Sequence, residues 1–208
     1  MSTTVKIIAL VAGLSLSLMG CGAPVKGYLK PGVTLSDTKS LAVIPFDNNS
    51  GEPDAGRKVG NLLLTELVQK EMFRIADMGE VENSLRRLRI RTAAEMDLSK
   101  LKSLGEQLGV QVVIIGSVYE YDLRQVRSGT VPVVALSARM LDVQTGEILW
   151  AVSHTRDGDD WETVFGFGRI ISLSRLARIV VSEVLESLTD ELQERAKAER
   201  RWQRARLK

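Results

Sequence analysis

VQVVIIGSVYEY, residues Val110 to Tyr121, is a nearly unbroken run of β-branched and apolar residues. Such a run predicts a strand, and its continuous apolarity predicts that both faces of the strand are buried in the middle of a sheet. A helical pattern of leucines, from Leu98 to Leu108, precedes the run and ends at Gly109, a residue that suits the position just after a helix. A helix that leads into a buried central strand is typical of α/β folds.

Four further strands and three further helices extend this core in both directions. The strands are predicted at residues 41–46, 73–77, 131–143 and 148–155, and helical stripes run through residues 59–67, 81–88 and 173–192. Val134, Leu136, Ala138 and Met140 alternate onto one side of their strand, and Gly146 marks a hairpin turn with positive φ. The order β-α-β-α-α-β-β-β-α predicts one α/β domain with a mixed sheet of about five strands, helices packed on it and a long C-terminal helix.

Composition excludes several classes of protein. With 208 residues, 44% hydrophobic and 26% charged, the chain is neither wholly disordered, collagen-like nor a multi-span membrane protein. One Cys and one His exclude a disulfide framework and a zinc cluster made from these residues. Aromatic residues at 5% are too few for a surface that stacks single-stranded nucleic acid. We expect no cofactor and no metal.

The N-terminus carries a signal for export. Lys6 is followed by thirteen uncharged residues, Ile7 to Met19, whereas a membrane-spanning helix needs about 20. The length fits the apolar core of a signal peptide. The segment ends in Leu18-Met19-Gly20-Cys21, which resembles the lipobox of bacterial lipoproteins. The resemblance implies cleavage after Gly20 and attachment of diacylglyceryl and acyl chains, such as palmitate, to Cys21. The alternative is an ordinary secretory signal with a chance Cys at its end.

The residues after Cys21 imply a location and a tether. In the sorting rule of bacterial lipoproteins, Gly22 in place of Asp favours the outer membrane, on its periplasmic face. Residues 21–39 have no apolar period and are interrupted by Pro24 and Pro31, so we expect a flexible tether there. The chain then divides into a signal peptide (1–20), the tether (21–39), an α/β domain (40–194) and a basic helix end (195–208).

Three stretches together resemble the curli-secretion lipoprotein family (CsgG-like). They are LAVIPFDNNSG at residues 41–51, LGVQVVIIGSV at 108–118 and DVQTGEILW at 142–150. They are also similar to the lipoprotein activators of penicillin-binding proteins (LpoB-like) and to the amino-terminal domain of the Tol-system translocation protein. The resemblance covers about residues 40–190, and it implies a periplasmic protein without enzymatic activity that works with envelope machinery.

The sequence departs from the pore-forming members of that family. Their pore needs two transmembrane hairpins from each subunit, with strands of about 9–11 residues. The gap where the first hairpin would lie, Asp122 to Thr130, has nine residues, and the gap for the second, Arg156 to Ile171, has sixteen. Neither gap is long enough, so we expect the shared domain without the pore.

Candidate catalytic and metal-binding residues each have a simpler interpretation. His154 is the only histidine, and a polar residue at a strand end is simpler than a general base without an evident nucleophile. The stretch Ser36-Asp37-Thr38-Lys39 matches the S-x-x-K pattern of penicillin-binding enzymes but lies in the tether. A solvated loop explains Asp157, Asp159, Asp160 and Glu162 better than a calcium site, because Gly158 falls between the acids.

The stretch Phe165-Gly166-Phe167-Gly168, with Trp161 before it, is apolar and interrupted by glycines. It lies where the second membrane hairpin of the CsgG-like family would be. Two interpretations stay open: a loop that packs its aromatic rings on the domain, or a contact with a partner or a membrane.

The near-neutral total charge hides a basic C-terminus. Residues 195–208 hold seven basic residues and one acid, Glu199, although the whole chain is only +2. One interpretation is a solvated helix end, where basic residues are favourable. The other is a contact with anionic lipid headgroups or with an acidic partner surface. The candidate contact residues are Arg195, Lys197, Arg200, Arg201, Trp202, Arg204, Arg206 and Lys208.

These features predict a lipid-anchored periplasmic lipoprotein of the outer membrane. It would act as a non-enzymatic adaptor or assembly factor in cell-envelope biogenesis or surface-structure secretion. A peptidoglycan synthase or secretion machinery is the expected class of partner, and the compartment excludes nucleic acid. The alternative is a ring-forming structural component of an export channel or a motility basal structure, which requires homo-oligomers.

Overall fold

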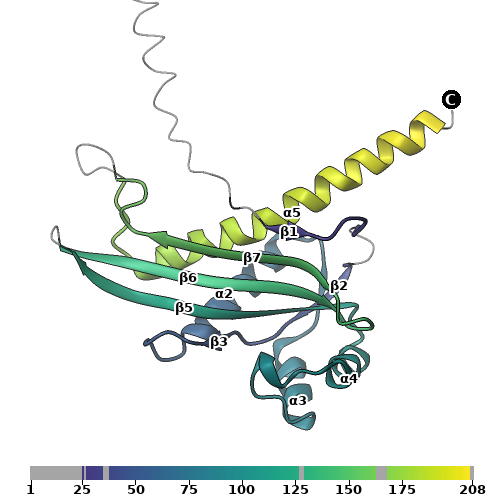
Figure 1. Ribbon diagram of the computed structural model, residues 1–208, viewed down its shortest axis with the longest axis horizontal. Helices are drawn as coiled ribbons and strands as arrows, with labels where there is room; N and C mark the ends of the chain where they lie inside the picture. The colour runs from purple at the N-terminus through teal and green to yellow at the C-terminus, as the bar shows by residue number, and fades with distance from the viewer. Residues whose placement is uncertain (1–24, 26, 35–37, 127–128, 163–167, 207–208) are drawn as a thin grey trace, which may run out of the picture.

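The computed structural model describes residue 25 and residues 27–34, 38–126, 129–162 and 168–206. Cys21, Ser36, the Phe165–Phe167 segment and Lys208 lie outside these residues, so the expectations placed on them stay predictions. Within the described residues, strands and helices build one open sheet with helices on both of its faces (Figure 1).

The secondary structure follows the predicted order, with two short strands added. The strands are β1 (Tyr28–Leu29), β2 (Ser40–Val43), β3 (Asp47–Asn48), β4 (Arg74–Ile75), β5 (Val112–Val126), β6 (Gly129–Asp142) and β7 (Ile148–Asp157). The helices are α2 (Ala55–Lys70), α3 (Met78–Arg87), α4 (Leu98–Leu108) and α5 (Leu173–Arg206), with the 3-10 turn η2 (Ala93–Glu95) between α3 and α4.

The sheet is mixed, as predicted. Its order is β1-β7-β6-β5-β2-β4, and β3 pairs with the outer part of β5. Strand β2 runs parallel to β4 and β5, whereas β5, β6, β7 and β1 pair antiparallel in succession. The run that opened the sequence analysis therefore does lie inside the sheet, as β5, between β6 and β2.

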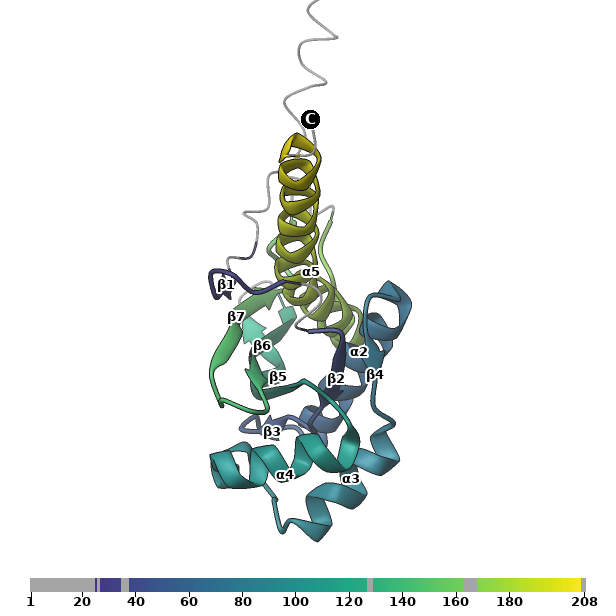
Figure 2. The same ribbon diagram turned by 90° about the vertical axis from the view of Figure 1, so that its right-hand side faces the viewer.

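Each face of the sheet has its own core (Figure 2). On one face, Leu41 and Val43 of β2 pack in the cluster that contains the buried sides of α2 and α5. On the other face, Ala42 and Ile44 pack with α3 and α4. The alternation of one strand between two apolar layers is what a sheet covered on both sides requires.

Local signals set most of the helix ends and turns. Asp77 begins α3, and its Oδ1 accepts hydrogen bonds from the backbone N–H of Gly79 at 2.8 Å and of Glu80 at 3.2 Å. Asp97 begins α4 in the same way by accepting from Lys100 N–H at 2.8 Å. Gly109 ends α4 with φ 61, and Gly146 forms the β6–β7 turn with φ 72, a conformation that costs glycine little.

Two strands were not predicted. β1 lies within residues 21–39, where we expected a tether, and it pairs Tyr28 with Ala151 and Leu29 with Trp150 of β7. In this part of the chain, Leu29 and Val33 are both buried and contribute to the core. The other added strand, β3, occupies the predicted turn after β2 and pairs Asp47 with Ser117.

The hairpin of β5 and β6 is longer than expected. Most of the nine residues that seemed to connect the two strands continue the ladder, with pairs from Asp122↔Val133 to Val126↔Gly129. Its pairing shifts by one residue between Val118 and Glu120, so Tyr119 is the extra residue of a β-bulge. Beyond the bulge, Tyr121 again faces the same core as Val118.

Candidate functional site

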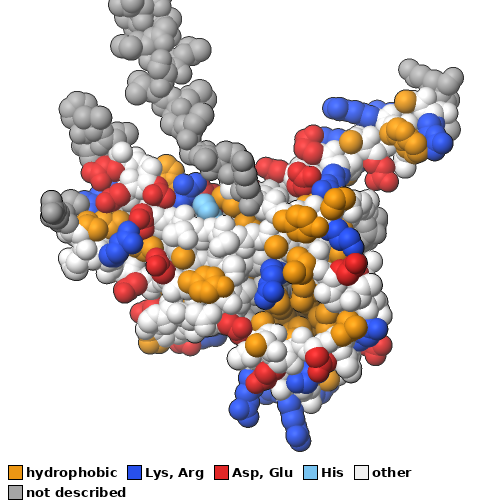
Figure 3. All heavy atoms as spheres, viewed as in Figure 1, with side chains coloured by type: hydrophobic (Ala, Val, Ile, Leu, Met, Phe, Trp, Pro, Cys, Tyr) orange, Lys and Arg blue, Asp and Glu red, His pale blue; other side chains and the backbone are white. Residues whose placement is uncertain are grey.

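The most distinctive surface is the C-terminal part of α5, which extends beyond the sheet (Figures 1 and 2). Leu192 is the last buried residue of the helix, and from Gln193 to Arg206 only Arg195 and Ala196 are even partly covered. At 1.5 Å per residue, these fourteen residues extend roughly 20 Å. The described basic residues of the predicted set lie in this part of the helix, and Figure 3 shows basic side chains along it.

Four of the basic residues form one stripe, which we call the basic stripe. Lys197, Arg200, Arg201 and Arg204 are spaced i, i+3, i+4 and i+7 along α5, so they share one face of the helix, and all four are exposed. Lys197 Nζ lies 2.8 Å from Glu194 Oε1, and this exposed pair holds the pKa of Glu194 below its ordinary value through the hydrogen bond from Lys197. The three arginines make no ion pair among the described residues.

Trp202 and Arg206 lie on a different face from the basic stripe. They continue the line of Leu188, Leu192 and Arg195, which faces the body of the protein. The Arg206 guanidinium stacks over the Trp202 ring at 4.2 Å from its centroid, and Trp202 is 57% exposed. The structure thus separates residues that the sequence had grouped together.

Arg195 turns inward and holds the N-terminal segment onto α5. Its Nη1 donates to the carbonyl oxygen of Lys30 at 2.7 Å, and its Nη2 donates to that of Leu29 at 3.1 Å. Its Nε donates to Glu191 Oε1 at 3.1 Å. The guanidinium therefore satisfies the carbonyl groups of the last residue of β1 and of the residue after it. These bonds were not foreseen, because the sequence does not show that residues 30 and 195 are neighbours.

The N-terminal segment crosses α5 just before β1. A Cβ added to Gly27 would lie 2.9 Å from Ser187 Oγ and 3.0 Å from Trp150 Nε1, so the chain passes close against α5 at Ser187. Gly27 is six positions after Cys21, and six residues span at most about 20 Å when fully extended. The chain is thus already in contact with the body at Gly27, within residues 21–39, where the sequence predicted a tether.

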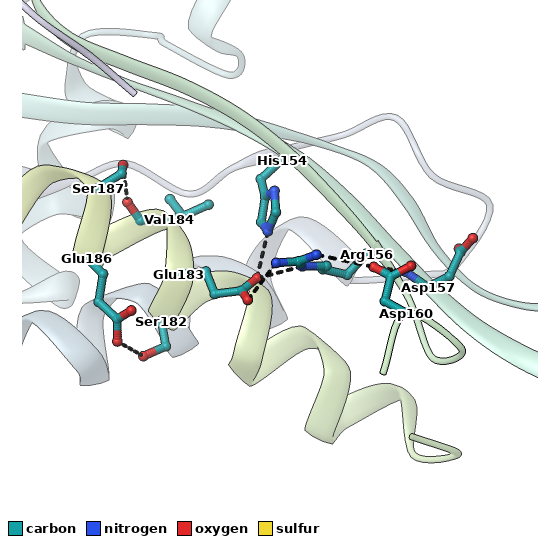
Figure 4. Close-up of polar contacts among 9 residues, drawn as sticks. All are labelled: His154, Arg156, Asp157, Asp160, Ser182, Glu183, Val184, Glu186 and Ser187. Atoms are coloured by element: carbon teal, nitrogen blue, oxygen red, sulfur yellow. Dashed lines mark hydrogen bonds and ion pairs between the residues drawn. The ribbon is translucent and has the colours of Figure 1, made fainter. Parts of the chain in front are cut away.

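His154 belongs to a charged cluster between β7 and α5 (Figure 4). Its Nε2 lies 2.6 Å from Glu183 Oε2, and Arg156 donates to the two oxygens of the same carboxylate, both at 2.9 Å. Burial raises the pKa of Glu183, but the hydrogen bonds from Arg156 and His154 outweigh it and leave the pKa below its ordinary value. The cluster is an ion-pair bridge between strand and helix.

Among the residues that the structure describes, no hydroxyl group is hydrogen-bonded to His154. Ser182 and Ser187 lie nearby on α5, but Ser182 bonds to Glu186 and Ser187 donates to the carbonyl of Val184 (Figure 4). A base of the serine-hydrolase kind needs a hydroxyl within hydrogen-bond reach. Glu183 had no signal in the sequence, because its partners lie 27 and 29 positions away.

Each aspartate of the acidic loop has an arginine partner. Asp157 pairs with Arg124 at 2.7 Å, Asp159 with Arg169 at 2.8 Å and Asp160 with Arg156 at 3.6 Å. Among the described residues, no group of three or more His, Cys, Asp or Glu side chains is arranged to hold a metal ion. Trp161 packs against the core with Arg156 over its ring at 5.1 Å, which fits the interpretation of a loop packed on the domain.

An open groove of about 640 Å³ lies between α2 and the start of α5. Lys58 crosses it, with its Nζ 2.7 Å from Glu52 Oε1 and 5.7 Å from the centroid of the Tyr121 ring. Burial raises the pKa of Tyr121. The charged groups of the groove are thus paired with each other.

No helix among the described residues has the length and apolarity needed to cross a membrane.

Comparison with known proteins identifies relatives of this fold. A family model described as "Curli production assembly/transport component CsgG" matches residues 33–200. The chain is similar to PelC of Paraburkholderia phytofirmans, a dodecamer, with 22% identity and a TM-score of 0.53 over 79% of this chain and 95% of PelC. It is equally similar to lipoprotein GNA1162 of Neisseria meningitidis, with 22% identity and a TM-score of 0.53 over 73% of this chain and 99% of that one.

One curated relative has a different description. The "Putative adenylate cyclase 3" of Rhizobium meliloti (strain 1021) is 26% identical over 131 residues, which are 63% of this chain and 20% of that protein. The chain therefore spans about one fifth of the length of this relative.

Proposed function

Because the chain belongs to the CsgG family, matched over residues 33–200, we propose that it is a lipid-anchored, non-enzymatic adaptor or assembly factor of the bacterial cell envelope. Its place would be the periplasmic face of the outer membrane, with the lipid on Cys21. Its partner would be an envelope machine, either a peptidoglycan synthase or a secretion apparatus. Cys21 itself lies outside the described residues, so the lipid anchor is part of the proposal.

The observation that carries the proposal is the short connection between the anchor and the folded body. In the proposal the lipid is attached to Cys21 of the lipobox-like ending, and six positions later Gly27 already packs against α5 and Trp150. A domain held this close to a membrane stays at high effective concentration for any partner in the same membrane. A rigid body on a short connection is what an adaptor needs, and it requires no catalytic group.

The polar groups of the protein support a role without catalysis. The candidate catalytic residue, His154, is bonded to Glu183, whose other oxygen is bonded to Arg156. We do not extend the cyclase activity named for the curated relative to this chain, because the matched region is only 20% of that protein. The family description, in contrast, matches most of the mature chain.

Replacement of the anchor residue tests the proposal. Cys21→Ala in the full chain should abolish labelling with palmitate and shift the protein from the membrane fraction to the soluble fraction. Gly22→Ala is the matched control, because it changes the neighbouring residue and leaves the thiol in place. Unchanged labelling in Cys21→Ala would contradict the lipid anchor.

A ring-forming structural role is the second candidate. The observation that favours it is the similarity in fold to PelC, which is a dodecamer. Native mass measurement on the detergent-solubilised, lipidated chain separates the two candidates. A defined oligomer larger than a dimer supports the ring, whereas a monomer at high protein concentration excludes it and leaves the adaptor.

A further inference from the structure

We infer that the basic stripe of Lys197, Arg200, Arg201 and Arg204 docks on the phosphate groups of anionic phospholipids in the membrane that holds the anchor. The inference deepens the proposed function and rests on it, because it needs the lipid at Cys21 to bring the helix to the membrane. It makes α5 a second membrane contact, distinct from the lipid.

The first step of the argument is the placement of the charges. The four residues of the basic stripe are exposed and lie on one face of a helix that projects away from the sheet. Of the two acids in this part of the helix, Glu199 lies on another face, five positions before Arg204 and two after Lys197, and Glu194 pairs with Lys197. Basic residues in the last turn of a helix interact favourably with its dipole, but Lys197 and Arg200 lie before that last turn. The number and spacing of the charges therefore exceed what helix capping requires.

The second step is the distance to the anchor. Gly27 contacts α5 at Ser187, and the six positions between Cys21 and Gly27 span at most about 20 Å when fully extended. From Ser187, Lys197 lies roughly 15 Å and Arg204 roughly 25 Å further along the helix. The extended length from Cys21 to Gly27 is similar to the length of α5 between Ser187 and the basic stripe. A membrane that holds a lipid on Cys21 therefore also lies within reach of the basic stripe.

The third step is the charge of the rest of the protein. Residues 195–208 have a net charge of +6 in a chain whose total is +2, so the remainder is acidic. An anionic membrane repels that acidic body and attracts the end of α5. Each basic residue near an anionic surface strengthens association by about five-fold. Four residues on one face then strengthen it by roughly a hundred-fold or more.

Trp202 offers a discriminating control, because it lies on a different face from the basic stripe. Docking through the basic stripe predicts that Trp202 is not required. Docking through an apolar tip that inserts between lipids predicts the opposite, since an exposed Trp ring partitions into membrane interfaces. Variants that change one face of α5 at a time, either the basic stripe or Trp202, therefore distinguish the two modes of docking.

The test uses the full lipidated chain in vesicles. A donor fluorophore on a short extension after Lys208 reports its distance from acceptor-labelled lipids by energy transfer. The vesicles contain phosphatidylcholine alone or a mixture with anionic phosphatidylglycerol. Energy transfer should be higher on the anionic vesicles and should fall to the neutral value at about 1 M salt, where the screening length is about 3 Å. The combined variant K197Q/R200Q/R201Q/R204Q should show the neutral value on both lipids.

Two controls define the specificity. The variant R86Q/R87Q/R89Q/R91Q removes the same number of exposed positive charges from α3 and the residues after it, and it should keep the wild-type response. Trp202→Ala should also keep it. Equal energy transfer of the wild type on both lipids, or a wild-type response of the four-residue stripe variant, would overturn the inference and leave an acidic protein surface as the partner class.

Flotation of the vesicles separates this inference from the proposed function. Recovery with the vesicles reports the lipid anchor and should be the same for neutral and anionic lipid. If the anchor is absent, the protein fails to float with neutral lipid, and the proposed function fails. If only the basic stripe is wrong, flotation is intact while the lipid dependence of energy transfer is lost.

Discussion

At the scale of single residues, Glu183 is the side chain that joins α5 to the sheet through charge. Its carboxylate accepts two hydrogen bonds from Arg156 and contacts His154 Nε2 at 2.6 Å, and its side chain is only 23% exposed. Removal of one partner from such a pair leaves the other charge without compensation in a partly buried site. Breaking the bridge therefore lowers the stability of the folded protein, although Glu183 is not fully buried.

Glu183→Gln should lower the free energy of unfolding by about 2 kcal/mol at pH 7, because it removes charge-assisted hydrogen bonds. The pKa of Glu183 is lowered in the folded protein, so its stabilisation is present above the unfolded-state pKa of about 4.3 and is lost as the pH falls through the lower folded value. The wild type and the variant should thus converge in acid. Urea unfolding at pH 7 and at pH 3 measures this.

The matched control is Glu186→Gln, which alters an exposed carboxylate on the same helix that bonds only to Ser182 at 3.4 Å. It should change stability by less than about 0.5 kcal/mol. A loss in Glu183→Gln that is no larger than in this control, or one that is the same at both pH values, would contradict the role assigned to the bridge.

Single residues were predicted well where their signal was local. Gly109 and Gly146 lie at turns whose chemistry is visible within a few residues, and both have positive φ in the structure. Glu183 and Arg195 were not assigned their roles, because their partners come from β7 and from the segment after β1. A helical pattern marks both as polar positions, but it does not show what folds against them.

At the scale of secondary-structure elements, β1 depends on contacts distant in sequence. It has two residues and pairs with β7. The carbonyl oxygens of Leu29, its last residue, and of Lys30 accept hydrogen bonds from Arg195. A strand this short has no intrinsic stability, so its order comes from the buried Leu29 and from the arginine. This is also why the sequence predicted a tether there: two residues carry no periodicity.

Arg195→Ala should release the segment after β1 without unfolding the domain. The backbone N–H of Lys30 donates to the carbonyl of Leu149 at 2.8 Å, and its hydrogen exchange reports whether β1 stays paired. Loss of the charged hydrogen bonds, each worth about 1.5–3 kcal/mol, should accelerate that exchange by at least ten-fold. Exchange in β5 should be unaffected.

Arg204→Ala serves as the control for this change, since it removes an exposed arginine from the same helix. Arg195→Lys should give an intermediate result, because an ammonium group lacks the fork geometry that reaches two carbonyl oxygens at once. If the Lys30 amide is equally protected in Arg195→Ala and in the control, the arginine does not hold β1.

At the scale of the whole molecule, the chain already contacts the folded body at Gly27, six positions after Cys21, the proposed site of the lipid. The sequence predicted a tether over residues 21–39, whereas Leu29 and Val33 within that range are buried. The fold class, the order of strands and helices along the chain and the apolar faces were predictable because they follow from periodicity. The contacts of residues 27–34 were not, because they depend on a strand that only the folded sheet creates.

Insertion of ten Gly and Ser residues between Ala23 and Pro24 should move the body away from the membrane. Flexible linkers of this length add on the order of 10–20 Å. Neutron reflectometry of the lipidated chain on a phosphatidylcholine bilayer, where the basic stripe has no charged counterpart, measures the gap. The wild-type gap should be no more than about 20 Å.

The control carries the same ten residues after Lys208 and should keep the wild-type gap. If the insertion near the anchor leaves the gap unchanged, some contact other than the segment from Cys21 to Gly27 sets the height of the body above the lipid.

The bulge at Tyr119 gives β5 one place where the chain can change length by a residue. Val118 pairs with Leu136 and Glu120 with Ala135, so Tyr119 has no counterpart on β6. Loss of Tyr119 would restore simple alternation and keep Val118 and Tyr121 on the same side of the sheet. Loss of any residue from Val112 to Ser117 would instead turn each side chain before the deletion to the opposite face of the sheet. Residues that pack in one core would then point into the other. In evolution, single-residue deletions in this strand should therefore be tolerated at the bulge and eliminated elsewhere.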